Sequence, residues 1–328
     1  MPGRAGARPD PVTAGEEQDS EPARRRDRWQ ARARAGGRLV ALTAKGAARD
    51  RLHGLAAEAS FWTMLSLPPL LLALLAIVGQ FGAVIGEDFA AQVAAAILGW
   101  AGNVFTEPTM RDVVRPLIAT TLTGGDSGIL SLSLLFALWS GSAALSNYLT
   151  AITVAYDMAG LRSFWRTRLL SLVLYLAALL AGAVVLPLLV LGPGILSRLL
   201  SGLPGPDLGW LVTVTYWPVV VLLSLAALTS LYHVAVPVKT RWSRDLPGAV
   251  LALLIWIAGS TMLRVYLASG LRGDAGPIGA PIAFLLFFFL TALAVLIGAE
   301  LNATIDGLRP DDSTRQGRQQ ARTRRGTS

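Results

Sequence analysis

Ionisable and amide side chains beside long apolar stretches are the residues of this sequence with the most capacity for chemistry. The densest group lies in LSNYLTAITVAYDMAGLRSFWRTRLL, where Asn147 and Asp157 precede Arg162, Arg166 and Arg168. Polar groups are costly inside a bilayer, so they mark either a substrate path or a structural pair. Arginine presents a flat fork of donors that suits phosphate or carboxylate. The stretch therefore predicts binding of an anionic group.

Other polar residues flank the remaining apolar segments at the same predicted depth. Glu58 precedes the first segment, Tyr232 ends the fourth and Arg241 follows it, and Glu300 and Asn302 close the last. We expect all of them to converge in a polar cavity open to the cytoplasm. The predicted lining is Glu58, Asn147, Asp157, Arg162, Arg166, Arg168, Tyr232, Arg241, Glu300 and Asn302. The alternative is a set of structural ion pairs and snorkelling side chains that tie helix ends together.

Catalytic chemistry finds little support in the sequence. The two histidines, His53 and His233, are far apart, and there is no HExxH motif, nucleophile elbow or P-loop. The chain has no cysteine, which excludes disulfides and thiolate metal sites. We expect no catalytic residues, no metal and no cofactor.

Hydropathy indicates the elements that position these residues. Hydrophobic residues make up 53% of the chain and charged residues 15%, which is too apolar for an ordinary soluble domain. A helix needs about 20 apolar residues to cross the hydrocarbon core. Six segments meet that length: 59–83, 129–151, 169–196, 208–232, 247–268 and 278–304. Four prolines inside them are candidate helix breaks, of the kind that carriers use at substrate sites: Pro68, Pro69, Pro187 and Pro218.

Basic residues alternate between connections as the positive-inside rule requires. They concentrate before the first segment, in the second and fourth connections and after the last segment, whereas the other connections are acidic or balanced. The pattern predicts an all-α, polytopic integral membrane protein with six transmembrane helices and both termini in the cytoplasm. The net charge of +8 is explained by this orientation and by attraction to anionic lipids, so no nucleic-acid partner is expected.

Four further regions complete the predicted organisation. Residues 1–36 form a disordered tail, and 37–58 form a juxtamembrane amphipathic helix, for which a frayed basic linker is the alternative. Residues 86–128 form an outer helical connection, with a re-entrant or buried helix pair as its alternative. Residues 305–328 form a disordered basic tail. The sequence does not specify an oligomeric state.

Several segments taken in order resemble the YihY/BrkB family of bacterial inner-membrane proteins, historically labelled ribonuclease BN. The most specific are Asp245-Leu246-Pro247-Gly248-Ala249, which opens the fifth span, and Gly298-Ala299-Glu300-Leu301-Asn302-Ala303, which closes the sixth. The resemblance covers roughly Leu52 to Asp306. The chain departs from the family pattern at Ser60-Phe61-Trp62, where a tyrosine-containing stretch is usual, and at 275–280, which lacks Tyr-Gly-Ser.

The resemblance implies a six-helix, multi-pass protein of the cell inner membrane that acts in the cell envelope. Together with the polar residues, it predicts a transporter or flippase for a lipid-like or anionic envelope component, with membrane lipids or a glycolipid as partners. A non-transporting scaffold for envelope integrity is the first alternative. A membrane-bound ribonuclease is the second, and no metal or acid–base cluster in the sequence supports it.

Overall fold

The structure is a computed structural model, and it describes most of the chain from residue 36 onward. The described ranges are 36–85, 110–122, 127–201, 209–238, 241–270, 276–308 and 312–326, with isolated positions between 91 and 107. All regular elements in these ranges are helices, and six of them are long. The long helices are α2 (Leu52–Ile85), α6 (Ser127–Ala155), α7 (Phe164–Ser201), α8 (Gly209–Ala235), α9 (Leu246–Gly270) and α10 (Gly276–Leu308). Each coincides with one predicted apolar segment.

Helix length and hydropathy make this a multi-pass membrane protein. Among the described side chains, four stretches are long and apolar enough to cross a bilayer. They are Phe164–Gly182, Val214–Ala235, Leu246–Tyr266 and Pro281–Leu308. The count of six spans and the cytoplasmic position of both termini remain predictions.

The four prolines do not break their helices, contrary to the sequence prediction. α2 runs through Pro68 and Pro69, α8 runs through Pro218, and α7 is continuous across position 187. The fixed φ of proline is compatible with a helix, and only one backbone hydrogen bond is lost at each position. In membrane helices, neighbouring groups and small local adjustments satisfy the carbonyl that is freed.

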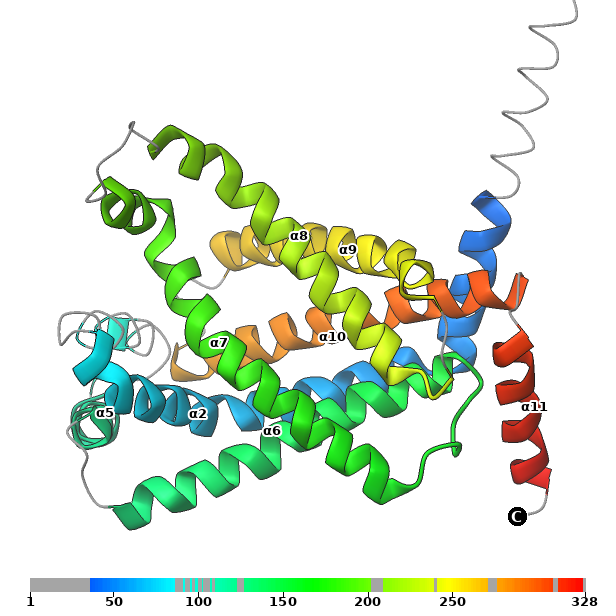
Figure 1. The fold of residues 1–328 in the computed structure, drawn as a ribbon, viewed down its shortest axis with the longest axis horizontal. Helices are drawn as coiled ribbons and strands as arrows, with labels where there is room; N and C mark the ends of the chain where they lie inside the picture. Colours follow the sequence, from blue (N-terminus) through cyan, green and yellow to red (C-terminus); the bar gives the residue numbers. More distant parts are fainter. Residues whose placement is uncertain are drawn as a thin grey trace, which may run out of the picture.

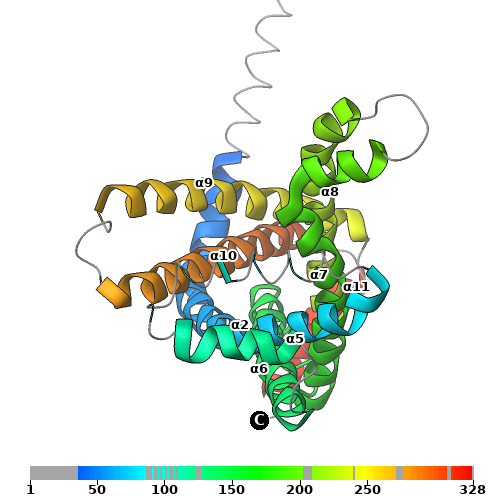
Figure 2. The same ribbon diagram turned by 90° about the vertical axis from the view of Figure 1, so that its left-hand side faces the viewer.

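Helix α10 is the centre of the packed core. It lies against α9 on one side and against α2 and α6 on the other, as Figures 1 and 2 show from two directions. The core side chains that it contributes include Ala292, Leu296, Ala299 and Ala303. Small residues allow close helix contact where lipid removes the hydrophobic drive for association. The core is concentrated at the C-terminal end of α10.

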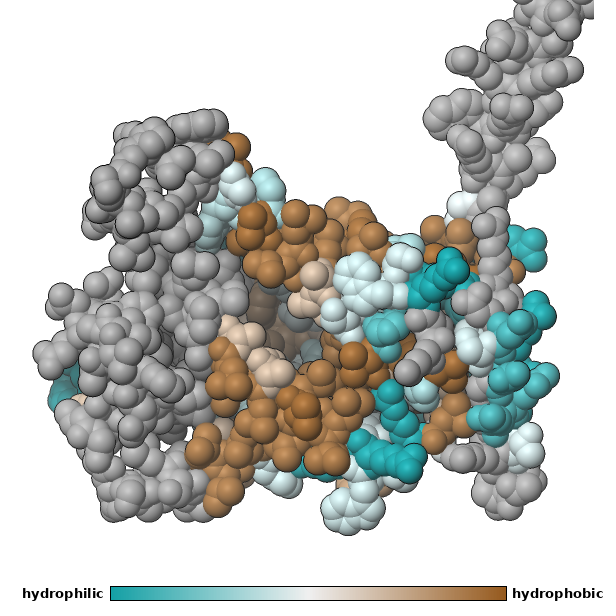
Figure 3. All heavy atoms as spheres, in the orientation of Figure 1, coloured by the Kyte–Doolittle hydropathy of each residue, from teal (hydrophilic) through white to brown (hydrophobic). Residues whose placement is uncertain are grey.

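Polar residues gather at that same end of the bundle. The helix over residues 36–49, the C-terminal end of α10 and α11 (Asp312–Gly326) lie together there in Figure 1. Figure 3 shows hydrophilic side chains at this end and a hydrophobic surface along the described helices beside it. We call these helices, together with the turn over 156–163 and the α8–α9 connection, the polar end.

The structure differs from the predicted organisation at the C-terminus. Residues 305–328 were expected to be disordered, but α10 continues to Leu308 and α11 follows over Asp312–Gly326. α11 has no apolar stripe to signal a packed helix. It is held instead by polar contacts through the buried Thr314 and through Arg318.

The other predicted regions are described in part. Residues 36–49 are helical, and Arg51, with φ 52°, separates that helix from α2. In the outer connection, the π-helix η1 (Met110–Val114) leads into α5 (Arg115–Leu122), which packs on α2 through a face with buried Ile118. The expected N-terminal tail and most of the first helix of the outer connection lie outside the described residues.

Candidate functional site

The turn after α6 builds one wall of a cavity at the polar end. Asp157 adopts φ 57°, and the backbone N–H groups of Asp157 and Met158 donate to the carbonyls of Val154 and Thr153 at 2.9 Å each. This is the Schellman arrangement, in which a left-handed residue reverses the chain and satisfies the last carbonyls of a helix. Met158 is completely buried behind the turn. Asp157 therefore has a backbone role that its spacing in the sequence did not reveal.

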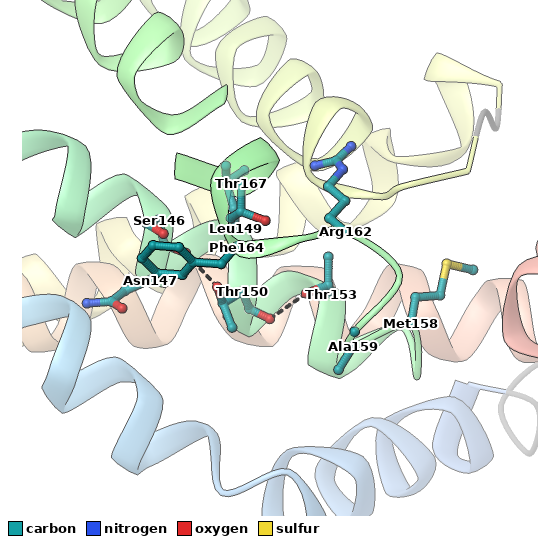
Figure 4. A pocket seen from close by; sticks show the side chains of 11 residues that line it. Ser146, Asn147, Leu149, Thr150, Thr153, Met158, Ala159, Arg162, Phe164 and Thr167 are labelled. Carbon is teal, nitrogen blue, oxygen red and sulfur yellow. Dashed lines mark hydrogen bonds between the residues drawn. The ribbon is translucent and has the colours of Figure 1, made fainter. Parts of the chain in front are cut away.

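The cavity lies between the end of α6, this turn and the start of α7, and has a volume of about 280 Å³. Four hydroxyl groups, one amide and one guanidinium are among its polar lining groups (Figure 4). Threonine and serine hydroxyls rotate and can either donate or accept. The polar lining residues are Ser146, Asn147, Thr150, Thr153, Arg162 and Thr167. We call this space the Arg162 cavity.

Arg162 is anchored at the edge of the cavity toward α8. Its Nη2 donates to the carbonyl oxygens of Val234 at 2.8 Å and Val236 at 3.2 Å. Nη1 of the same guanidinium is buried and has no hydrogen-bond partner among the described residues. Burial lowers the pKa of the Arg162 guanidinium, yet arginine stays charged at neutral pH. A positive charge fixed at the edge of a polar cavity favours binding of an anion there.

A second group of polar residues lies between α8, α9 and the turn after α6. The Asp245 carboxyl accepts from the Tyr156 hydroxyl at 3.1 Å and lies 3.4 Å from Nδ1 of His233. The distance to His233 is long for a hydrogen bond, and neither atom of that contact has a hydrogen-bond partner among the described residues. Burial raises the pKa of the Asp245 carboxyl, and the contacts with Tyr156 and His233 oppose that rise. Burial also raises the pKa of Tyr156.

Asn302 joins α10 to the first turn of α9. Its Oδ1 accepts from the backbone N–H of Gly248 at 2.7 Å, and its Nδ2 donates to the carbonyl of Asp245 at 2.8 Å. The first N–H groups of a helix have no partner within it, so Asn302 caps α9 from another helix. Gly248 and Gly298 allow this approach, because a Cβ on either glycine would overlap the carbonyl oxygen of the other. The two segments most specific to the family resemblance are thus a single helix crossing.

Two arginines tie the ends of the helices together through Asp306. Arg244 lies 3.4 Å from one Asp306 oxygen, and Arg318 of α11 lies 3.3 Å from the other. Arg318 also donates to the carbonyls of Tyr156 and Ala303, at 3.3 Å each. These bonds attach α11 to the turn after α6 and to the end of α10.

A third group surrounds Glu300, whose carboxyl lies beneath the helix over 36–49. Glu300 is 4% exposed, and its Oε2 has no hydrogen-bond partner among the described residues. Arg49 of that helix pairs with the neighbouring Asp50 at 2.8 Å and lies 3.5 Å from Asp157. The hydrogen bond to Asp50 is the main cause that raises the pKa of Arg49.

The structure distributes the ten predicted cavity residues rather than gathering them. Asn147 and Arg162 line the Arg162 cavity, Asn302 belongs to the α9–α10 crossing, and Asp157 faces Arg49. Tyr232 is fully buried next to that crossing and donates to the Val295 carbonyl at 2.8 Å. Glu300 lies beneath the helix over 36–49, apart from the others. The remaining four positions are the exposed Glu58, Arg166 and Arg241, and Arg168, which donates to the Trp139 carbonyl at 3.0 Å.

Sequence reasoning missed several residues of these groups. Asp245 and Gly248 were noted only as the opening of a span, and Tyr156, Asp306 and Arg318 were given no role. An aspartate two residues before Pro247-Gly248, at the position that caps a helix start, is a signal that could have identified Asp245. Among the described residues, no group of three His, Asp or Glu side chains is placed to hold a metal ion.

Comparison with known proteins identifies the family of this chain. A family model described as virulence factor BrkB matches residues 43–324. A Bacillus subtilis (strain 168) protein whose name describes it as ribonuclease-like, YfkH, is 32% identical over 197 residues, which are 59% of this chain and 71% of the relative. No solved structure matches the chain. The matched region includes all six long helices, the Arg162 cavity and the α9–α10 crossing, and the chain belongs to the virulence factor BrkB family.

Proposed function

We propose that this protein moves a lipid-like, anionic component of the cell envelope across the bacterial inner membrane, without covalent chemistry. The observation that carries the proposal is the Arg162 cavity, whose lining combines the positively charged Arg162 with hydroxyl and amide groups (Figure 4). A charged headgroup would bind there while its apolar chains stay in the bilayer.

The chemistry of the cavity favours a phosphate or carboxylate group. Charge-assisted hydrogen bonds from arginine are about twice as strong as those between neutral groups. Because Val234 and Val236 already hold Nη2, the guanidinium is oriented before a ligand arrives. Preorganisation of this kind lowers the cost of binding. A volume of about 280 Å³ admits a small headgroup and excludes a bulky one.

The surfaces of α7 and α8 provide an apolar route next to the cavity. Large apolar side chains on both helices face outward, including Val173, Leu180, Trp217 and Leu222. Figure 3 shows the molecular surface hollowed between apolar side chains in this region. Acyl chains could follow this surface while the headgroup moves through polar surroundings. A scaffold without transport would need the same outward apolar faces but would not need an anion site.

The experiment is reconstitution of the full chain into vesicles of phosphatidylcholine that contain fluorescent phosphatidylglycerol. Dithionite bleaches only the outer leaflet, so the extent and rate of bleaching report movement between leaflets. We expect faster movement with the protein than in empty vesicles, and little effect on fluorescent phosphatidylcholine. Arg162→Gln should reduce the effect at least tenfold, since one charge-assisted contact is worth about 1.5–3 kcal/mol.

Arg166→Gln is the matched control, because Arg166 is exposed and lies on the same segment. That variant should move the probe like the unchanged protein. Equal loss in both variants would mean that net charge, not the cavity, determines movement. No movement above empty vesicles for either lipid would favour the scaffold.

A further inference from the structure

Glu300 is a buried carboxyl group that belongs neither to the Arg162 cavity nor to the α9–α10 crossing. It lies near the end of α10, is 4% exposed, and leaves Oε2 without a hydrogen-bond partner among the described residues. An ionised carboxylate removed from water is costly unless donors surround it. A protonated carboxyl avoids most of that cost and gains a donor of its own.

The helix over residues 36–49 covers this carboxyl with one face. Along that face Thr43, Gly46 and Ala47 are buried or half-buried, whereas Ala44, Lys45 and Ala48 are exposed. Gly46 lies directly against Glu300, and a Cβ at that position would overlap Oε1. The Thr43 hydroxyl, one turn earlier on the same face, is also buried and without a partner among the described residues. Two unpaired polar groups therefore lie where this helix meets the bundle.

The charges around Glu300 make an ionised form still less compatible with the seated helix. Asp50 comes from the covering segment and Asp157 from the turn after α6, and both act on Glu300 together with Arg49. Arg49 is the one cation of this group and already pairs with both aspartates. Lys45 and Arg51 of the covering segment are exposed, as is Glu58 of α2. Three carboxylates would thus share a single arginine.

We infer that Glu300 is a proton-binding site, and that the proton it takes up holds the helix over 36–49 against the membrane domain. With the proton bound, the neutral carboxyl fits against Gly46. When the proton leaves, Asp50 and Asp157 repel the carboxylate and its Oε2 has no donor among the described residues, so the covering helix separates and water can reach it.

The absence of native cysteine allows a direct test in the full chain, because an introduced thiol is unique. Ala47→Cys places a thiol on the covered face, and Ala48→Cys places one on the exposed face of the same helix. The ratio of their maleimide labelling rates cancels the intrinsic effect of pH on thiols. It should rise several-fold between about pH 6 and about pH 9, a range that includes the values found for buried glutamates.

Glu300→Gln should keep the ratio low and independent of pH, while Glu58→Gln, at an exposed acid, should leave the rise intact. A rise that persists in Glu300→Gln would overturn the inference, as would a flat ratio in the chain that retains Glu300.

A second measurement needs no substitution at Glu300. Dicyclohexylcarbodiimide reacts with protonated carboxyl groups in apolar surroundings, so the peptide with Glu300 should gain the reagent mass near pH 6 and not near pH 9. Failure to label at any pH would also overturn the inference.

Discussion

Replacing Asn302 with alanine tests whether the α9–α10 crossing holds the membrane domain together. The substitution removes both hydrogen bonds of a side chain that is 2% exposed. The carbonyl of Asp245 keeps the bond from the N–H of Ala249 at 3.3 Å, but the N–H of Gly248 loses the partner that Asn302 gives it. The change therefore leaves one buried backbone donor unpaired.

The expected loss follows from these two bonds. A buried donor without a partner costs about 1–3 kcal/mol, and the net value of the second bond is about 0.5–1.5 kcal/mol. Interhelical hydrogen bonds in membranes average only about 0.6 kcal/mol, because groups in the unfolded state find other partners. The Gly248 N–H lies in the first helical turn, where the backbone offers none, so the larger figure applies. We expect the free energy of unfolding to fall by about 2–4 kcal/mol.

The assay is reversible unfolding in mixed micelles, followed by the fluorescence of the nine tryptophans. Asn147→Ala is the matched control, since the same amide is removed from a half-buried position in the cavity wall. It should change the unfolding free energy by no more than about 0.5 kcal/mol. Equal losses for Asn302→Ala and Asn147→Ala would refute the capping argument.

Two further predictions concern close packing and topology. Gly298→Ala adds a Cβ that overlaps the Gly248 carbonyl oxygen, and a backbone atom cannot move aside. We expect at least about 3 kcal/mol of destabilisation, measured as a smaller amount of folded protein in the membrane. Gly54→Ala, where nothing lies within 4 Å of the added Cβ, should instead be neutral or gain about 0.5–1 kcal/mol. Reporter fusions after Arg168 should read cytoplasm and fusions near Asp112 should read the outside; the reverse result would contradict the predicted orientation.

The long helices could be predicted because their signal is local and summed over many residues. Hydropathy over about 20 positions is little affected by any one side chain, so the apolar runs and the helices coincide. The prolines misled the prediction for the complementary reason. One proline was taken as evidence against a helix that about twenty apolar residues favour, although a helix tolerates one lost hydrogen bond when its neighbours are packed.

The polar contacts could not be predicted because they join residues that are distant in sequence. Depth in the membrane can be estimated from sequence, and Glu300, Asn302 and Arg162 all lie at the polar end of the structure. Rotation around each helix axis cannot be estimated in the same way, since a hydrophobic surrounding leaves no amphipathic signal to fix it. That rotation directs Asn302 to α9 and Glu300 to the helix over 36–49, although the two are only two residues apart.

This separation has a mechanical consequence for the protein. Asn302 and Glu300 lie on one rigid helix, so the α9 cap and the cover over Glu300 share a support. Both polar groups of the Asn302 side chain are hydrogen-bonded, so they hold α9 in one position against α10. Glu300 has an oxygen without a hydrogen-bond partner among the described residues, so the helix over 36–49 can be either seated on it or separated from it. Without the cap, α10 would be held less firmly, and it would move together with the covering helix. Asn302→Ala should therefore also weaken the pH dependence of the Ala47→Cys labelling ratio, whereas Asn147→Ala should preserve it.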